Sequence, residues 1–368
     1  MQTVYYYQER PLEFSKSLFL AGPSPRSSDV GSWRPEALNI LRQKGYDGIV
    51  YVPEFRDGIH PPADYKDAPF WEHRMIDASD MVLFWIPRDL EKLPGFTTNV
   101  EFGMLAESGK LTLGSPPSAA KMRYLNFLAK KYHIPNHETI EYVIQKTLQL
   151  IGSGAFRTGG EIEVPLHIWR LRAFQNWYQA QIKVGNRLDG SKVEWISRVK
   201  NHPEAIFAFA IRPNVYVRTE NRNKINDPIV SRLDISSIVM YKPTKELLDT
   251  EIVLIREFRT AGSTKDGFVW ELPGGSSPYI TDPLLVAIEE AREEVGINIE
   301  SYRFKYISSR QMAATLSTHK SHTYAVLLTP NEMAWIKSQK GIPKGSDIDT
   351  NPTGERAYTE VATLREIL

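Results

Sequence analysis

Short apolar runs alternate with helical patterns over the first 150 residues, and this alternation constrains the fold more than any other feature of the chain. The runs lie in KSLFLAGP, GIVYVPEF and MVLFWIPR, and each has the length and continuity of a strand buried on both faces of a parallel sheet. Segments with helical periodicity, such as SWRPEALNILRQKGYDG and NVEFGMLAESGK, accompany them. We therefore predict an α/β domain over residues 1–150, with an open, mostly parallel sheet of the Rossmann or flavodoxin-like kind. Ligands of such sheets bind outside the carboxyl ends of the strands.

The pattern changes after residue 150. A glycine-rich break, GSGAFRTGGEIE, opens a segment over residues 151–203 that we predict to be a partly helical connector. From residue 204 onward, β-type runs such as AIFAFAIR, SSIVMYKP and EIVLIREFR surround one good helical pattern. This arrangement predicts a second, α+β domain over residues 204–368.

The bulk composition narrows the class of partner. The chain has 368 residues, a net charge of +1 and no cysteine. The balanced charge argues against binding to a nucleic-acid polymer, and the absence of cysteine excludes disulfides and thiolate metal sites. The apolar runs are too short to span a membrane, and the N-terminal residues lack the pattern of a signal peptide. We expect a cytoplasmic protein that acts on small molecules.

Four glutamates crowd the end of the helix predicted in the second domain. Asp282 and Pro283 suit its start, and Gly296 suits its stop. Like charges at i,i+4 cost roughly 0.2–0.5 kcal/mol per pair, and the helix dipole disfavours carboxylates at this end. A divalent cation, Mg²⁺ or Mn²⁺, is one compensation for the four carboxylates. The alternative is a solvated acidic face with Arg292 as the counterion. The four glutamates are Glu289, Glu290, Glu293 and Glu294.

The surrounding stretch, WELPGGSSPYITDPLLVAIEEAREEVGI, resembles the Nudix box, whose pattern is Gly-x5-Glu-x7-Arg-Glu-apolar-x-Glu-Glu-x-Gly-apolar. VLIREFR and FVWELPGG are similar to the ADP-ribose pyrophosphatase branch of that family. Over residues 204–368 the resemblance implies a Nudix fold and metal-dependent hydrolysis of a nucleoside diphosphate derivative such as ADP-ribose. It implies metal binding by Glu290, Glu293 and Glu294, with Glu294 also catalytic. It further implies substrate contacts from Trp270 and Glu271, and assistance by a distal base such as Glu355.

Two positions depart from the Nudix pattern. Thr281 stands where the first signature glutamate is expected, and Glu289 stands where the signature arginine is expected. The alternative for this domain is therefore a catalytically inactive nucleotide sensor that regulates the first domain. Metal dependence of nucleotide turnover distinguishes the two.

A glutamate follows the central apolar run of the first domain, in PGFTTNVEFGMLAESGK. We expect Asn99 to cap the next helix, which places Glu101 in its first turn. There the helix dipole favours the ionised carboxylate, the form that acts as a nucleophile. The structural alternative is that a glutamate in a first turn simply stabilises the helix.

LFLAGP, ASDMVLFWIP and TTNVEFG resemble motifs of the nucleoside 2-deoxyribosyltransferase family, over about residues 16–150. The resemblance implies that Glu101 attacks C1′ of the sugar and expels the base. It places Asp80 at the acidic position that opens the central strand. From FWEHRMIDASD, Glu72 or Asp77 would protonate the departing base or hold a sugar hydroxyl. Asn99 and the loop of Ala21, Gly22 and Pro23 would contact the substrate, in an enzyme that is often a homo-oligomer.

The two resemblances together predict a bifunctional enzyme of nucleotide metabolism. Its first domain would cleave or transfer at an N-glycosidic bond, and its second would hydrolyse a nucleoside diphosphate derivative. Nucleosides or nucleotides are the expected small-molecule partners, and NAD-like compounds contain both types of bond.

Overall fold

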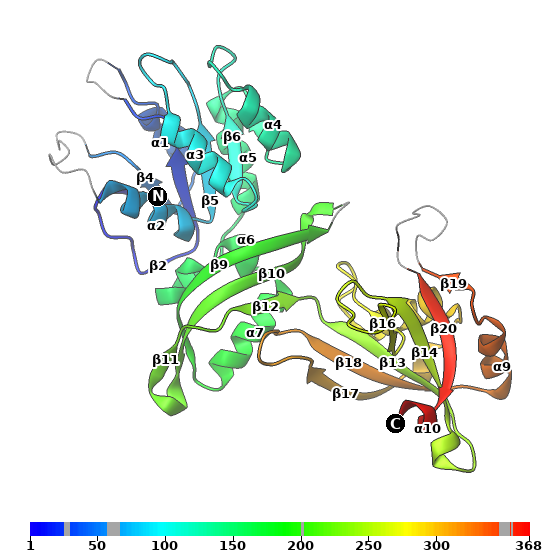
Figure 1. The fold of residues 1–368 in the computed structure, drawn as a ribbon. Helices are drawn as coiled ribbons and strands as arrows, with labels where there is room; N and C mark the ends of the chain where they lie inside the picture. Colours follow the sequence, from blue (N-terminus) through cyan, green and yellow to red (C-terminus); the bar gives the residue numbers. More distant parts are fainter. Residues whose placement is uncertain (26–29, 57–66, 200–201, 346–353, 355) are drawn as a thin grey trace. The chain divides into compact units, whose positions relative to one another are not determined.

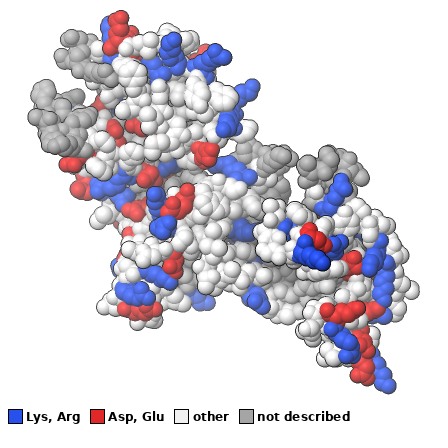
Figure 2. Space-filling model, in the orientation of Figure 1, with Lys and Arg blue, Asp and Glu red and all other residues white. Residues whose placement is uncertain are grey.

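The computed structural model describes residues 1–25, 30–56, 67–199, 202–345, 354 and 356–368 (Figure 1). The chain folds into two compact units, Met1–Val230 and Ser231–Leu368. On the face shown in Figure 2, acidic and basic side chains are interspersed on both units. No helix within the described residues combines the length and the apolar character needed to cross a membrane.

A six-stranded sheet organises the first unit, in the order β1-β4-β3-β5-β6-β7, and every neighbouring pair is parallel. Without the edge strand β1, the order along the chain is 2-1-3-4-5, which is that of flavodoxin-like folds. The prediction of an α/β domain with a mostly parallel sheet is confirmed. The strands are β1 (Gln2–Tyr5), β3 (Ser17–Ala21), β4 (Ile49–Val52), β5 (Met81–Trp85), β6 (Leu111–Gly114) and β7 (Asn136–His137).

Helices cover both faces of this sheet. Side chains of α2, α3 and α4 pack with Phe19 and Phe84 in one apolar core, whereas those of α1 and α5 pack with Leu18 and Leu83 in another. Adjacent strand residues thus serve opposite faces, which explains why the strands are apolar throughout. The helices are α1 (Arg34–Gln43), α2 (Ala68–Ala78), α3 (Phe96–Leu105), α4 (Arg123–Lys131) and α5 (Ile140–Ile151).

The rest of the first unit is a helical and antiparallel layer. Strand β10 pairs with β9 over most of its length, so the structure places residues 204–230 with the first unit. Phe174, Phe209 and Ile211 form part of a separate core beneath these strands. The elements are β2 (Glu13–Phe14), β8 (Arg157–Thr158), η1 (Gly159–Glu163), α6 (Leu166–Trp169), α7 (Arg172–Lys183), β9 (Arg187–Val199), β10 (His202–Val217), β11 (Arg222–Lys224) and β12 (Ile229–Arg232).

The second unit is built on a sheet in the order β17-β18-β13-β14-β20-β19, with β15 added to β14 and β16 added to β13. Its pairs are antiparallel except for β13 with β18, and helices α8 and α9 supply residues to its core. The elements are β13 (Ile235–Lys242), β14 (Glu251–Phe258), β15 (Phe268–Glu271), β16 (Gly274–Gly275), α8 (Pro283–Glu290), the π-helical turn η4 (Ala291–Val295), β17 (Lys305–Gln311), β18 (Lys320–Leu327), α9 (Pro330–Ser338), β19 (Pro343–Lys344), β20 (Ala357–Thr363) and α10 (Leu364–Ile367).

Candidate active site

A cavity of about 300 Å³ lies at the carboxyl ends of β3 and β5, where the order of the parallel sheet reverses direction. Open α/β sheets bind their ligands at such a switch point. The structure brings five of the predicted residues together in the lining of this cavity, which we call the Glu101 pocket: Ala21, Gly22, Pro23, Glu72 and Glu101.

Glu101 enters the pocket from the second turn of α3. The helix begins at Phe96, and its N-cap is Gly95 in the left-handed conformation, with φ of 59°. The prediction that Asn99 caps the helix is wrong, because the chain already turns into the helix at Gly95. Asn99 is exposed and accepts a hydrogen bond from Arg88 at 2.5 Å. It is not among the residues that line the pocket.

The electrostatic environment of Glu101 differs from the expected one. The pKa of Glu101 is raised to about 7, chiefly by burial and secondly by the nearby Glu72 carboxylate, while Arg34 partly opposes the rise. The expectation that the helix dipole holds Glu101 ionised is therefore wrong in direction, because the second turn lies beyond the strongest field of the dipole and the pocket is desolvated.

Glu72 projects into the same pocket from α2. Burial raises the pKa of its carboxyl group, and a hydrogen bond donated by the Tyr6 hydroxyl partly offsets that rise. Two carboxyl groups in one desolvated pocket do not ionise independently, so the pKa values observed in a titration describe the two groups together. Both carboxyl groups therefore hold a proton to higher pH than an exposed glutamate does.

Arg34, which sequence analysis missed, holds the loop that follows β3. Its buried guanidinium group donates to the carbonyl oxygens of Leu20 and Gly22, at 3.0 and 2.8 Å. It also donates to the Ser24 hydroxyl at 3.0 Å and to Glu54 at 2.5 Å. Arg34 thus fixes the predicted sugar-side loop and supplies positive charge near the two carboxyl groups. Its position at the start of a helix gave no signal of this role.

Gly22 is required by close packing at the bottom of this loop. A Cβ atom at this position would lie 2.2 Å from the carbonyl oxygen of Trp85 and 2.9 Å from the ring of Trp33. The indole nitrogen of Trp33 donates to the carbonyl oxygen of Pro23 at 3.1 Å. The loop is therefore seated directly on the end of β5.

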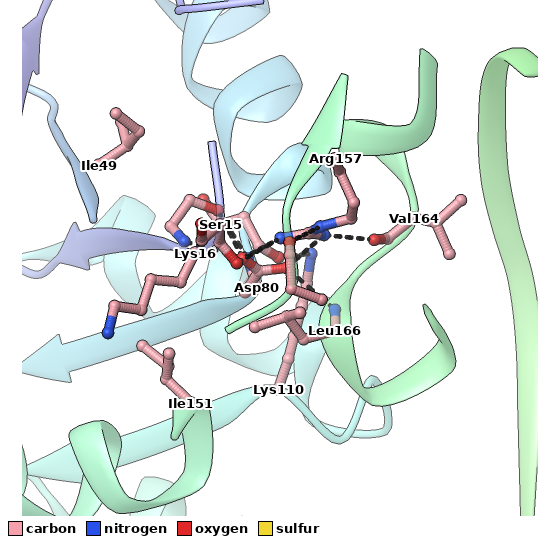
Figure 3. A network of polar contacts seen from close by, with 12 residues as sticks. Ser15, Lys16, Ile49, Asp80, Lys110, Ile151, Arg157, Val164 and Leu166 are labelled. Atoms are coloured by element: carbon pink, nitrogen blue, oxygen red, sulfur yellow. Dashed lines mark hydrogen bonds and ion pairs between the residues drawn. The ribbon is translucent and has the colours of Figure 1, made fainter. Parts of the chain in front are cut away.

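Asp80 lies at the amino end of β5, on the edge of the sheet opposite the Glu101 pocket, so the structure does not bring it to the predicted catalytic site. Its buried carboxylate accepts two hydrogen bonds from Arg157, at 2.8 and 2.7 Å, and one from the backbone N–H group of Leu166, at 2.9 Å (Figure 3). It also accepts one from the backbone N–H group of Ser17, at 2.8 Å. In place of a catalytic role, these contacts give Asp80 a structural one.

Asp77 is also absent from the Glu101 pocket. It lies in the last turn of α2 and its side chain is exposed, at the rim of a different cavity of the first unit. Of the two acids proposed to protonate the base, only Glu72 faces Glu101.

The glutamate-rich helix of the second unit has the predicted ends. The Asp282 side chain accepts a hydrogen bond from the N–H group of Leu284, and Gly296 is left-handed with φ of 80°. Between them the α-helix gives way to a π-helical turn over Ala291–Val295. Lys344 donates to the Val295 carbonyl oxygen at 2.6 Å, which places a cation at the negative end of the helix.

Two glutamates of this helix reach the strand β16, and a third lies beside Arg292. Glu294 is buried and accepts a hydrogen bond from the N–H group of Gly274 at 2.8 Å, and Glu290 lies against Gly275. Glu293 is more exposed, and its carboxylate lies 3.8 Å from the Arg292 guanidinium group. Within the described ranges, no three Asp, Glu or His side chains converge as the ligands of a metal ion.

The predicted substrate residues of the second unit lie on β15. Trp270 is exposed, and the Glu271 carboxylate accepts hydrogen bonds from Arg259 at 2.7 and 3.1 Å. The suggested base Glu355 lies outside the described residues.

A family model described as "Nucleoside 2-deoxyribosyltransferase like" matches residues 15–119. The match includes β3, α2 and α3, which supply residues to the Glu101 pocket. No curated protein matches the chain. The N-terminal resemblance is thereby confirmed, and residues 15–119 form a nucleoside 2-deoxyribosyltransferase-like domain within the first unit.

Proposed function

We propose that the first unit cleaves or transfers the N-glycosidic bond of a nucleoside or nucleotide, with Glu101 as the nucleophile. One observation carries the proposal: Glu101 and Glu72 line a single pocket at the switch point of the sheet, within the transferase-like domain. Paired carboxyl groups that flank a glycosidic bond are the usual machinery of glycosyl chemistry.

The chemistry divides between the two carboxyl groups. The ionised Glu101 attacks C1′, the bond from C1′ to the base nitrogen breaks, and the departing base takes a proton from Glu72. Water, or a second base, then attacks C1′, gives up its proton to Glu72 and releases Glu101. Burial raises the pKa of both carboxyl groups, so the pair holds a proton near neutral pH, and the reaction requires that proton to lie on Glu72 when Glu101 attacks.

A chromatographic screen tests this proposal. The intact protein is incubated with nucleosides, 2′-deoxynucleosides and their monophosphates, with and without an added acceptor base, and free base is quantified. Glu101→Gln should abolish base release, whereas Glu91→Gln, in an exposed turn, should leave it unchanged. Release of base by Glu101→Gln at the wild-type rate would remove Glu101 from the mechanism.

For the second unit we propose binding of a nucleoside diphosphate derivative such as ADP-ribose without turnover, as a sensor that regulates the first unit. Among the residues that the structure describes, no three carboxyl or imidazole groups converge as metal ligands, which favours this over the predicted Mg²⁺- or Mn²⁺-dependent hydrolysis. Exposed Trp270 offers a surface on which an adenine ring can stack.

Calorimetry with ADP-ribose, in Mg²⁺ and in EDTA, distinguishes the two functions when paired with product analysis. A sensor binds ADP-ribose in both buffers and forms no AMP. Formation of AMP that requires Mg²⁺ and is lost in Glu294→Gln, but retained in the exposed control Glu300→Gln, would establish the hydrolase instead.

A further inference from the structure

The first turn of α3 forms one end of the Glu101 pocket. Residues 95–98 all belong to the pocket lining, one helical turn before Glu101. The loop after β3 meets this turn, since a Cβ atom on Gly95 would lie only 3.0 Å from the side chain of Pro23. We call residues 95–98, together with the lining residues 22–25 of the loop, the α3 end of the pocket.

The backbone N–H groups of this turn are available to a ligand. Helix α3 has no side-chain cap, and the N–H groups of residues 96–98 donate no hydrogen bond to another residue in the part of the chain that the structure describes. The first N–H groups of a helix have no partner within the helix, and the helix dipole adds positive potential there. Such an end attracts an anion.

Thr98 provides a second, independent observation. Only 2% of the residue is exposed, yet it lines the pocket. Its hydroxyl group makes no hydrogen bond to any described residue and lies at the helix start, 3.3 Å from the position of a Cβ atom on Gly95. Unlike the unpartnered hydroxyl group of Tyr51, it is not sealed from every accessible surface. Buried polar groups are rarely left without a partner, so the Thr98 hydroxyl group points to a ligand atom at this end of the pocket.

The acceptors of the neighbouring loop are already engaged. The carbonyl oxygen of Gly22 accepts from Arg34 at 2.8 Å, and that of Pro23 accepts from the Trp33 indole at 3.1 Å. The Ser24 hydroxyl group also accepts from Arg34, at 3.0 Å, so its own proton remains for another acceptor. The α3 end therefore presents N–H and O–H donors to a ligand.

A phosphate group complements such a set of donors. Its three terminal oxygens are strong acceptors, whereas a sugar hydroxyl group brings a proton that itself requires an acceptor. The buried Arg34 adds a positive charge behind the loop. This charge reaches the pocket, because it opposes the rise in the pKa of both Glu72 and Glu101.

The spacing along α3 suits a nucleotide. Thr98 and Glu101 are three residues apart on the helix, so they share one face at roughly 5–6 Å between Cβ atoms. The 5′-phosphate of a nucleotide stands at a similar distance from C1′. With C1′ at the Glu101 carboxylate, the phosphate therefore reaches the start of the helix. The pocket volume, about 300 Å³, lies at the lower end of the range for small-molecule sites.

We propose that the α3 end of the Glu101 pocket binds the 5′-phosphate of a nucleoside 5′-monophosphate, and that this compound, not the free nucleoside, is the substrate. The N–H groups of residues 96–98 and the hydroxyl groups of Thr98 and Ser24 donate to the phosphate oxygens. The choice of a nucleotide rests on the proposed function, whereas the phosphate contacts do not require Glu101 to be the nucleophile.

Calorimetry on Glu101→Gln provides the test, because this variant should leave the ligands intact. The full chain is titrated with the common ribonucleosides and 2′-deoxynucleosides, their 5′-monophosphates and their 3′-monophosphates. Chromatography of the recovered solution checks that no base was released. Thr98→Val, added to Glu101→Gln, replaces the hydroxyl group with a methyl group, and Thr98→Ser restores the hydroxyl group. Thr139→Val is the matched control, because Thr139 is exposed at the start of α5 and makes no cap hydrogen bond.

We expect at least one 5′-monophosphate to bind at least about tenfold more tightly than its nucleoside and its 3′-monophosphate. Thr98→Val should weaken that binding at least about tenfold and leave the nucleoside unaffected, because a hydrogen bond to a charged group is lost. Thr98→Ser and Thr139→Val should retain the preference. Nucleotide binding by the second unit is recognised by its indifference to Thr98→Val.

Three results would overturn the proposal. No 5′-monophosphate binds more tightly than its nucleoside, the 3′-monophosphates bind as tightly as the 5′-monophosphates, or Thr98→Val leaves the preference for the 5′-phosphate unchanged. Failure of the proposed function has a different signature. Base release by Glu101→Gln at the wild-type rate, with the preference still dependent on Thr98, would remove the nucleophile and retain the phosphate site.

Discussion

Arg157 donates two parallel hydrogen bonds to Asp80, at 2.8 and 2.7 Å, and both side chains are completely buried. The pair joins the amino end of β5 to the strand β8, which follows the last helix on the sheet. Bidentate geometry and additional hydrogen bonds are what a buried ion pair needs to offset the loss of hydration. The pair thus anchors the α6 layer to the parallel sheet.

Asp80→Asn should destabilise the protein strongly, because it leaves the Arg157 charge buried without its counterion. We expect a loss of about 3–5 kcal/mol in the free energy of unfolding, measured by urea denaturation. Asp47→Asn, which removes an exposed ion pair with Lys16, should cost less than about 1 kcal/mol. A variant Asp80→Asn that is as stable as wild type but inactive would restore the catalytic role that the sequence suggested.

The parallel sheet was predictable because its strands are buried on both faces, which gives them uninterrupted apolar runs such as MVLFWIP. The ends of α8 were predictable because Asp282 and Gly296 carry the capping chemistry in their own side chain or backbone. The start of α3 was not. Gly95 begins that helix through its backbone conformation alone. It lies four residues before Asn99, the residue type that is usually preferred at an N-cap.

The stability of the protein should depend on pH through Glu101. Its pKa is raised from 4.5 to about 7 in the folded state. The protonation of Glu101 therefore contributes at most about 3 kcal/mol to the free energy of unfolding. This contribution is complete below about pH 4.5 and is lost as the pH rises through 7. Wild type should lose stability relative to Glu101→Gln between pH 5 and 8, as measured by urea unfolding. Parallel pH profiles for the two proteins would show that Glu101 has an ordinary pKa.

Tyr6→Phe should shift the pH dependence of base release. The Tyr6 hydroxyl lowers the pKa of Glu72, so its removal raises the pKa at which the carboxyl pair loses its last proton. The alkaline limb of the kcat/KM profile, which reports the loss of the proton from the acid, should therefore move to higher pH. The exposed neighbour provides the control, since Tyr7→Phe should leave the profile in place. An unshifted limb in Tyr6→Phe would exclude Glu72 as the acid.

Gly22→Ala and Gly103→Ala should have opposite effects. The new methyl group at position 22 meets the Trp85 carbonyl oxygen, so we expect a loss of about 1–3 kcal/mol and impaired activity. Position 103 lies in the same helix as Glu101 with open space around it, where alanine should stabilise by about 0.5–1 kcal/mol. Thermal unfolding measures both. A Gly22→Ala variant as stable as wild type would mean that the loop after β3 can shift without loss of stability.

Much of the site could not be predicted from sequence, because its contacts join distant segments. Asp80 and Arg157 are 77 residues apart, and nothing near either residue indicates the other. Glu101 was predictable because the short motif around it carries the family resemblance, although its raised pKa arises from burial and from Glu72 on another helix.

The nucleophilic role of Glu101 is tested most directly by trapping the sugar on the enzyme. Turnover of the substrate found in the base-release screen is quenched with acid, and the digested protein is mapped by mass spectrometry. We predict the mass of the sugar on the peptide that contains Glu101, its absence in Glu101→Gln, and base release at least about a thousandfold slower in that variant. Sugar attached to a different residue, or base release that continues undiminished in Glu101→Gln, would contradict the assignment.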